Sequence, residues 1–528
     1  MGRLAWACAV VALWTGAAVA QAYKVETLVP GSAFHGVHGI RFSPAGELWA
    51  GSVAGQSLYA VDPATGKVRL VEGPPKGMAD DIAFGPGGQV VWTAISEGVV
   101  YSRKGEGPVE AIASIPSINA IAFSRDGKRL FASQVFGGDD LWELDPTGRK
   151  PPRKIREKMN GFNSFWPGPD GWLYGPVWFR GQVAKVHPDT GEMVVISEGL
   201  KTPASVKFDS KDRLYVIDTA TGELLRADLK TGARTRVAQL STSLDNFAID
   251  SRDRIFVSNM ADNGIQEVDP ATGAVRQVIK GALAFPADLA VRVENGREVL
   301  HVADVFAYRT VDAATGQVRD VARVHALGTH LEYPTGATAA GDEVILASSA
   351  SGTVQVFKGG KDPAMIVREL AAPTDALRLP DGSLLVAEVA AGRLSIIDEG
   401  KRTLTEGLMA PVSLALGPPG QVWLVEAAGV LSRVDLATGA KTPVATGLRL
   451  PKAVAVGPDG GLYVLEMGAR QVVRVDPATG AKTVLATNLP VGLVTQPIPL
   501  AGGIAVGPSG TIYVSSDVEN SILKLTPP

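Results

Sequence analysis

Cysteine is almost missing from this chain: Cys8 is the single one among 528 residues. Beyond the N-terminus the sequence therefore offers no thiol, no disulfide and no cysteine-ligated zinc site. Charged residues make up only 20% of the chain, and the formal net charge is −3. This balance excludes a protein-wide basic field for nucleic acid. A hydrophobic content of 45% excludes a disordered chain.

Long apolar runs are absent too, except for one short stretch near the N-terminus. Arg3 precedes the apolar residues Leu4 to Trp14, and Ala18-Val19-Ala20 or Ala20-Gln21-Ala22 offers a cleavage pattern. The stretch is shorter than the ~20 residues that span a membrane. Residues 1–22 are therefore predicted to be a secretory signal peptide, with a short membrane anchor as the alternative. The mature protein is expected in the periplasm or outside the cell, without membrane contact.

Several familiar catalytic motifs are missing as well. The sequence has no His-Glu-x-x-His, no nucleophile elbow, no P-loop and no glycine-rich dinucleotide fingerprint. The common metalloprotease, serine-hydrolase, nucleotide-hydrolysing and dinucleotide-binding classes thus have no support.

Turn formers are abundant, with 60 glycines and 35 prolines, and they recur in a pattern. Asp-Pro-Ala-Thr-Gly or a close variant begins at Asp62, Asp145, His187, Asp228, Asp269, Asp312, Asp435 and Asp476. The spacings are multiples of about 41 residues, a period typical of propeller blades. Each repeat contains short strands rich in β-branched residues, as in Ala453–Val456, Leu462–Leu465 and Gln471–Val475.

Twelve such units predict an all-β protein of twelve four-stranded blades. They start near His38, Asp80, Asn119, Asn163, Ala204, Asp245, Ala287, Thr335, Thr374, Val412, Lys452 and Gly502. Because single rings usually hold four to eight blades, we expect two six-bladed β-propellers in tandem. A less regular all-β array is the alternative. The predicted rings span 23–270 and 274–528, each closed by its own N-terminal strand, at 24–28 and 275–279.

The blade motifs resemble those of the senescence marker protein/gluconolactonase (lactonase) family, and also NHL-repeat and streptogramin-lyase blades. The likeness rests on the motifs at 38–44, 126–127, 163–174 and 457–463. The resemblance implies a metal-dependent hydrolase acting on a small molecule. In the lactonase pattern a Glu enters the first blade, two Asn follow, and an Asp binds metal and acts as base.

This sequence matches that pattern only in part. Asn119 and Asn163 fall on the two Asn positions, but His38 stands where the Glu is expected and Ala204 where the Asp is expected. The streptogramin-lyase pattern, a His with a Glu in the same blade, is broken because Ser52 takes the place of the Glu.

The residues that enter the inner strands of the first ring are the candidate site, because loops at the mouth of a central channel commonly bind ligands. Oxygen donors converging there suit a hard cation such as calcium. The predicted metal ligands are Asp80, Asn163 and Asp245, and the candidate catalytic groups are Asp245, Asp80 and His38. The alternative is that these groups only cap backbone at the strand entries.

Other polar and aromatic residues are expected around this site. Asn119, Asn163, Trp178 and Arg180 are predicted to bind substrate, the last two from a loop at the rim. Acids that end the second strand of many blades are expected to accept N–H groups of the next blade. His325, His330 and Glu332 form either a second metal site or a solvated loop.

Two functions follow from these residues. One is an exported, divalent-metal-dependent hydrolase of the lactonase type. The other is a non-catalytic propeller that binds a protein, a sugar or a small ligand, since the fold alone does not choose.

Overall fold

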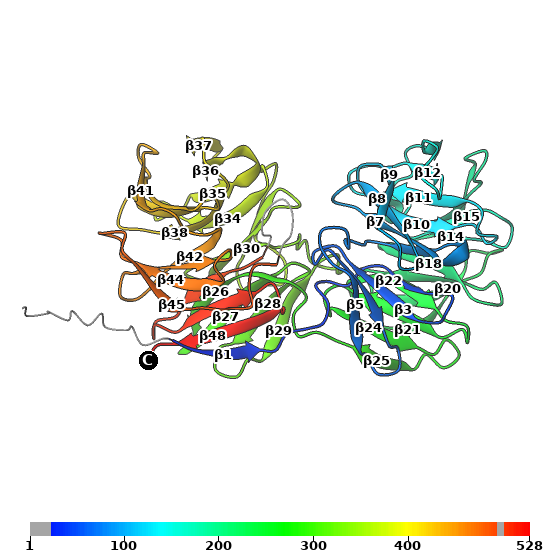
Figure 1. Ribbon diagram of the computed structural model, residues 1–528, viewed down its shortest axis with the longest axis horizontal. Helices are drawn as coiled ribbons and strands as arrows, with labels where there is room; N and C mark the ends of the chain where they lie inside the picture. The colour runs from blue at the N-terminus through cyan, green and yellow to red at the C-terminus, as the bar shows by residue number, and fades with distance from the viewer. Residues whose placement is uncertain (1–22, 494–500) are drawn as a thin grey trace, which may run out of the picture.

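The computed structural model describes residues 23–493 and 501–528, and the predicted signal peptide lies outside them. The described residues form twelve four-stranded antiparallel sheets, arranged as two rings side by side (Figure 1). The prediction of an all-β protein with two six-bladed propellers is therefore confirmed. No helix in the described part is both long and apolar enough to cross a membrane.

The first ring holds six blades of four consecutive strands each. Its strands are β2 (Ile40–Phe42), β3 (Leu48–Ser52), β4 (Ser57–Val61), β5 (Val68–Glu72); β6 (Ile82–Phe84), β7 (Gln89–Ala94), β8 (Val99–Lys104), β9 (Glu110–Ser114); β10 (Ile118–Phe123), β11 (Leu130–Gln134), β12 (Leu141–Leu144), β13 (Arg153–Arg156); β14 (Trp166–Pro167), β15 (Leu173–Val177), β16 (Gln182–Val186), β17 (Met193–Glu198); β18 (Pro203–Phe208), β19 (Leu214–Asp218), β20 (Glu223–Ala227), β21 (Arg234–Gln239); and β22 (Leu244–Ile249), β23 (Ile255–Asn259), β24 (Gly264–Val268), β25 (Val275–Ile279).

The second ring holds the other six blades. Its strands are β26 (Pro286–Glu294), β27 (Arg297–Asp304), β28 (Ala307–Asp312), β29 (Val318–Arg323); β30 (Gly336–Ala340), β31 (Glu343–Ser348), β32 (Thr353–Phe357), β33 (Met365–Val367); β34 (Pro373–Arg378), β35 (Leu384–Glu388), β36 (Arg393–Ile397), β37 (Lys401–Glu406); β38 (Pro411–Leu416), β39 (Gln421–Glu426), β40 (Val430–Asp435), β41 (Lys441–Ala445); β42 (Pro451–Val456), β43 (Leu462–Glu466), β44 (Gln471–Val475), β45 (Lys482–Ala486); and β46 (Ile504–Val506), β47 (Ile512–Ser516), β48 (Ser521–Thr526) with β1 (Lys24–Val29). The short helices η1 (Pro86–Gly88), η2 (Trp178–Arg180) and η3 (Val389–Ala391) lie in turns.

The predicted ring closure is wrong. β1 pairs antiparallel with β48, from Lys24 opposite Thr526 to Val29 opposite Ile522, so it belongs to the last blade of the second ring. β25 is the outer strand of the sixth blade and does not close the second ring. The first ring therefore runs from β2 to β25 without help from the N-terminus. The predicted bounds 23–270 and 274–528 change accordingly, and the first ring is inserted between β1 and β26 of the second.

The recurring turn shows how each blade meets its neighbour. In the first blade, Asp62 accepts the Ala64 N–H at 2.9 Å, and Gly66 adopts a φ of 73°. A Cβ on Gly66 would lie 2.4 Å from the carbonyl oxygen of Val278, in the outer strand of the sixth blade. Gly316 of the seventh blade has the same relation to Leu28 of β1. Glycine is thus required where the turn touches the preceding outer strand.

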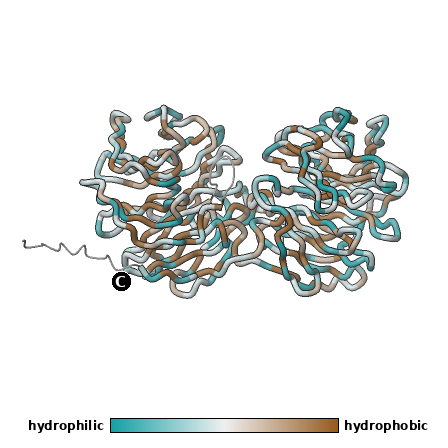
Figure 2. Tube along the Cα trace, in the orientation of Figure 1, coloured by the Kyte–Doolittle hydropathy of each residue, from teal (hydrophilic) through white to brown (hydrophobic). Residues whose placement is uncertain are grey.

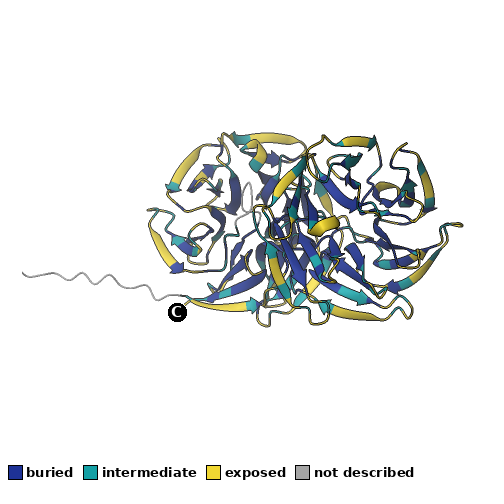
Figure 3. Ribbon diagram, turned by 45° about the vertical axis from the view of Figure 1, so that its right-hand side comes forward, coloured by how far each residue is buried: buried dark blue, intermediate teal, exposed yellow. Residues whose placement is uncertain are grey.

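Apolar residues gather on the inner strands and between neighbouring blades. Figure 2 shows hydrophobic colour inside the rings, and Figure 3 shows exposed residues mainly on outer strands and turns. One core cluster joins Val425 of the tenth blade to Val464 and Val473 of the eleventh. Burial of these faces against each other is the main stabilising contribution to the rings.

Acidic side chains hold the blades in two ways. Asp218, at the end of β19, accepts the backbone N–H groups of Lys201 and Thr202 at 2.7 and 3.2 Å. These residues lead into β18 of the same blade, so the expectation that such acids bind the next blade is wrong. That second role belongs to Asp81, whose carboxylate accepts the Ile121 N–H of the following blade at 3.2 Å.

Candidate functional site

An imidazole between two carboxylates lies at the axis of the first ring. His38 precedes β2, Asp80 precedes β6, and Asp245 lies in β22, so three blades bring these side chains together. His38 Nδ1 lies 3.5 Å from Asp80 Oδ1 and 3.7 Å from Asp245 Oδ1. The His38 Nε2 atom is buried and has no hydrogen-bond partner among the described residues. We call these three residues the axial cluster.

Burial and the charges of neighbouring groups shift the pKa values of His38 and Asp80. Burial opposes protonation of His38, but the carboxylates of Asp245 and Asp80 outweigh it and raise the pKa of the imidazole. Burial, together with the like charge of Asp245, raises the pKa of Asp80 to about 8. At neutral pH the cluster therefore holds a protonated Asp80 carboxyl group beside an imidazole whose pKa is raised. Such perturbed groups at one point are characteristic of sites that move protons.

Two asparagines lie in the same column of strand entries. Asn119 is buried at the start of the third blade, and its side chain hydrogen-bonds Asp80 and so lowers that carboxyl's pKa. Asn163 is buried before β14, an inner strand of only two residues, Trp166 and Pro167. Ala204, at the fifth entry, contributes no polar group. The column thus reaches the axis from five of the six blades.

The residues that follow Asp80 and Asp245 in sequence, Asp81 and Asn246, have a structural role. Asp81 accepts the N–H groups of Ile82 and Ile121, and Asn246 accepts the Phe247 N–H. In the second ring, Asp375 likewise accepts the N–H groups of Ala376 and Leu414. The expectation that strand-entry residues accept backbone N–H groups therefore fits Asp81, Asn246 and Asp375. The side chains of the axial cluster make no such contacts with the described residues.

A cationic layer lies deeper in the first ring. Lys207 Nζ donates to Asn246 Oδ1 at 2.9 Å and to Ser164 Oγ at 3.3 Å. Burial, and after it the charge of Arg41, lowers the pKa of Lys207 to about 7. The Trp166 ring lies 4.2 Å from the Arg41 guanidinium and 5.1 Å from Lys207 Nζ. The large Trp166 therefore replaces a small inner-strand residue where two cations need an aromatic neighbour.

The second ring contributes residues to the mouth of the first. We call residues 324–335, which connect β29 to β30, the cap segment; the equivalent connection from β37 to β38 spans only 407–410. Ser243 Oγ donates to the Val324 carbonyl at 2.6 Å, and the Leu327 N–H donates to the Ala220 carbonyl at 3.0 Å. The cap segment thus contacts the fifth and sixth blades of the first ring.

Three aromatic side chains of the second ring reach the axial region. His325 and Tyr333 come from the cap segment, and their Nε2 and hydroxyl oxygen lie 2.6 Å apart. Phe306 packs edge-on against His38 with ring centroids 5.3 Å apart. The sequence pointed to His325 only as part of a loop cluster with His330 and Glu332. The structure separates them, because His330 is exposed and pairs with Asp362.

The two predicted rim residues differ in position. Trp178 is buried, and its ring packs edge-on against His325 with centroids 5.0 Å apart. Arg180 is exposed, and its Nε donates to Asn160 Oδ1 at 3.2 Å. Only Trp178 is therefore joined to the residues around the axis.

The predicted metal ligands do not fit a calcium ion as they are arranged. Calcium takes six to eight oxygen ligands, and here a nitrogen of His38 lies between the carboxylates of Asp80 and Asp245. Among the described residues, no group of three or more His, Cys, Asp or Glu side chains is arranged to hold a metal ion. Cation binding at Asp80, Asn163 and Asp245 would require His38 to turn away.

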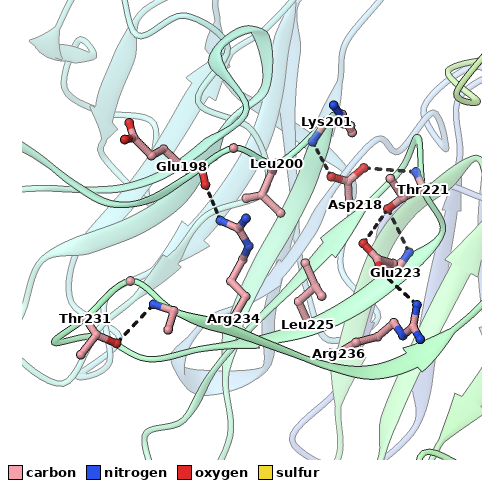
Figure 4. Close-up of a pocket in the computed structure, with 13 residues that line it drawn as sticks. Glu198, Leu200, Lys201, Asp218, Thr221, Glu223, Leu225, Thr231, Arg234 and Arg236 are labelled. Atoms are coloured by element: carbon pink, nitrogen blue, oxygen red, sulfur yellow. Dashed lines mark hydrogen bonds and ion pairs between the residues drawn. The ribbon is translucent and has the colours of Figure 1, made fainter.

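A cavity of about 520 Å³ lies between the outer parts of the fourth and fifth blades (Figure 4). Two of its arginines are engaged: Arg234 donates to the Glu198 carbonyl at 2.5 Å, and Arg236 pairs with Glu223 at 3.4 Å. No residue of the axial cluster lines this cavity.

Comparison with known proteins bears on the first ring. No curated protein matches the chain. A solved structure, the extracellular domain of the one-component system BT4673 from B. thetaiotaomicron, shares 11% identity with a TM-score of 0.33. That alignment covers 96% of this chain and 82% of the other. The sequence profile of one family, described as "SMP-30/Gluconolactonase/LRE-like region", matches residues 42–292. Residues 42–292, which run from β2 of the first ring into β26 of the second, are therefore similar to this family, as the blade motifs predict.

Proposed function

We propose that the first ring is a small-molecule hydrolase of the lactonase type and that the axial cluster performs the reaction. The observation that carries the proposal is the pairing of His38 Nδ1 with two carboxylates, which leaves Nε2 without a partner. A carboxylate at Nδ1 holds the proton there, so the lone pair at Nε2 is the base. The family match over residues 42–292 supports the class of reaction.

The reaction requires no group beyond the site and water. Water attacks the lactone carbonyl carbon while His38 Nε2 accepts its proton, and Asp245 stabilises the resulting imidazolium. The side-chain N–H groups of Asn119 and Asn163 donate to the carbonyl oxygen as it gains charge. The ring C–O bond then breaks, and Asp80, which burial keeps protonated, supplies a proton to the departing alkoxide. The product is a hydroxy acid, and transfer of a proton from the His38 imidazolium to the Asp80 carboxylate, 3.5 Å from Nδ1, restores the site.

A panel of lactones tests this proposal. Asp245→Asn and His38→Gln should each lower kcat/KM by at least about 100-fold, because each removes the oriented base. Glu294→Gln is the matched control, since Glu294 pairs with His301 at 2.9 Å away from the axial cluster. The rate should rise with pH as His38 loses its proton and fall near pH 8 as Asp80 does. Full activity in either axial variant would place the chemistry elsewhere.

Metal dependence, which the family resemblance implies, is tested separately. A cation bound between Asp80 and Asp245 must displace the proton that Asp80 holds, so its affinity should increase with pH. Calcium titration during thermal unfolding measures this. A stabilisation that Asp80→Asn and Asp245→Asn abolish and Glu426→Gln retains would establish a cation site. No stabilisation in the wild type would support the metal-free reaction.

A non-catalytic binding protein is the second candidate function. The observation that favours it is Ala204, which stands where the resembled lactonases have their metal-binding Asp. Calorimetry distinguishes the two, because a binding protein would retain an intact lactone without releasing hydroxy acid.

We also propose that the protein is exported. Residues 1–22 carry the pattern of a signal peptide, and the chain beyond them has no cysteine. The mass of the mature protein from periplasmic and cytoplasmic fractions tests this, and a full-length chain confined to the cytoplasm would refute it.

A further inference from the structure

A row of aromatic side chains from both rings runs beside the axial cluster. We define the aromatic row as Phe136, Trp178, His325, Tyr333 and Phe306. Phe136 contacts Trp178 with ring centroids 5.6 Å apart, and Trp178 contacts His325 at 5.0 Å. His325 contacts Tyr333 at 5.4 Å, and Tyr333 contacts Phe306 at 6.1 Å. The row is continuous across the junction between the rings.

The two ends of the aromatic row differ in exposure. At the outer end, Phe136 is 54% exposed and its neighbour Phe179 is 58% exposed. At the inner end, Phe306 is buried against His38. The row therefore runs from exposed rings to the axial cluster through successive edge-to-face ring contacts. Contiguous exposed apolar side chains are a feature of ligand-binding grooves.

The aromatic row offers a ligand little polarity. The one hydrogen bond within it joins His325 Nε2 to the Tyr333 hydroxyl. Burial lowers the pKa of His325 to about 4, so its ring is neutral at physiological pH. Arg180, two residues after Trp178 and predicted to bind substrate, donates a hydrogen bond to Asn160. A hydroxyl-rich ligand would leave its polar groups unpaired against these faces, whereas an apolar ligand would not.

We propose that the aromatic row is a subsite of the axial site and that the substrate is a lactone with an aromatic or apolar substituent. This inference rests on the proposed function and names its substrate class. The substituent lies along the row, against the faces of Phe136, Trp178 and His325, while the lactone carbonyl meets the axial cluster. The second ring thus determines specificity for a reaction performed in the first.

Two δ-lactones of opposite character test the inference. Wild-type kcat/KM should be at least about tenfold higher for dihydrocoumarin than for D-glucono-1,5-lactone. The double variant Phe136→Ala, Phe179→Ala should lower kcat/KM for dihydrocoumarin about tenfold, mainly through KM, and should leave gluconolactone within about twofold. Both residues are exposed, so the variant should fold. Leu70→Ala, at another exposed apolar residue, is the control.

Binding keeps this test separate from the test of catalysis. Calorimetry with chroman and with 1,5-anhydroglucitol, two rings without a scissile bond, should show binding of chroman alone and its loss in the double variant. If neither lactone is hydrolysed but chroman binds in this way, the proposed function fails and the subsite stands. A preference for the sugar ligands, or an equal effect of the double variant on both lactones, would overturn the subsite.

Discussion

At the scale of single residues, neighbouring positions in one strand entry have opposite roles. Asp81 satisfies two backbone N–H groups and joins adjacent blades. Asp80, one residue earlier, instead faces His38, and burial raises its pKa to about 8. A carboxyl group that folding deprives of its charge lowers stability above its ordinary pKa. The axial cluster is therefore expected to lower the free energy of unfolding, as preorganised sites commonly do.

The pH dependence of stability tests this cost. A raised pKa means that the folded state binds the proton more tightly, so stability falls as pH rises from about 4 to about 8. Asp80→Asn removes this loss. It should stabilise the protein by more than about 1 kcal/mol at pH 8 and have almost no effect at pH 4. Denaturant unfolding at both pH values measures it, with the exposed Glu399→Gln as control. A destabilised variant at pH 8 would mean that Asp80 is a structural carboxylate.

At the scale of elements, the blade is encoded locally. Strand pattern, turn glycine and turn aspartate lie within one repeat, which is why the twelve blades were predictable from sequence. The strand β1 was misplaced because its alternating pattern, KVETLV, suits the outer edge of any blade. The strand-entry column placed His38, Asp80 and Asp245 for the same local reason. The sequence assigned His325 to a different cluster and gave no signal for Tyr333, because the positions of both depend on how the two rings pack.

Buried and exposed turn aspartates should differ in their effect on stability. Asp218 is buried and accepts the N–H groups of Lys201 and Thr202. Asp218→Ala should cost about 2 kcal/mol, because it leaves two part-buried donors without their charged acceptor. Asp228→Ala, at an exposed turn where water replaces the carboxylate, should cost less than about 1 kcal/mol. If urea unfolding gave the same loss of free energy of unfolding for both variants, Asp218 would not stabilise the contact between β19 and the start of β18.

At the scale of the molecule, the first ring is an insertion in the second. The chain starts in the second ring with β1, crosses to build the first ring, and returns near residue 283. The two crossings lie together, because Ser32 Oγ donates to the Leu283 carbonyl at 2.9 Å. The two chain crossings and the cap segment hold the second ring against the mouth of the first. This contact places the second-ring residues of the aromatic row beside Trp178 and His38.

Hydrogen exchange tests this topology through one buried residue. Val29 is fully buried in a core cluster with Leu300 and Ile522 of the second ring, although in sequence it lies next to the first. Val29→Ala should cost about 2 kcal/mol and should speed exchange in β1 and β46–β48. Ile40→Ala, in the core of the first blade, should instead speed exchange in β2–β5 and β22–β25. If Val29→Ala loosened β22–β25 and left β48 protected, the N-terminal strand would close the first ring, and the insertion would be wrong.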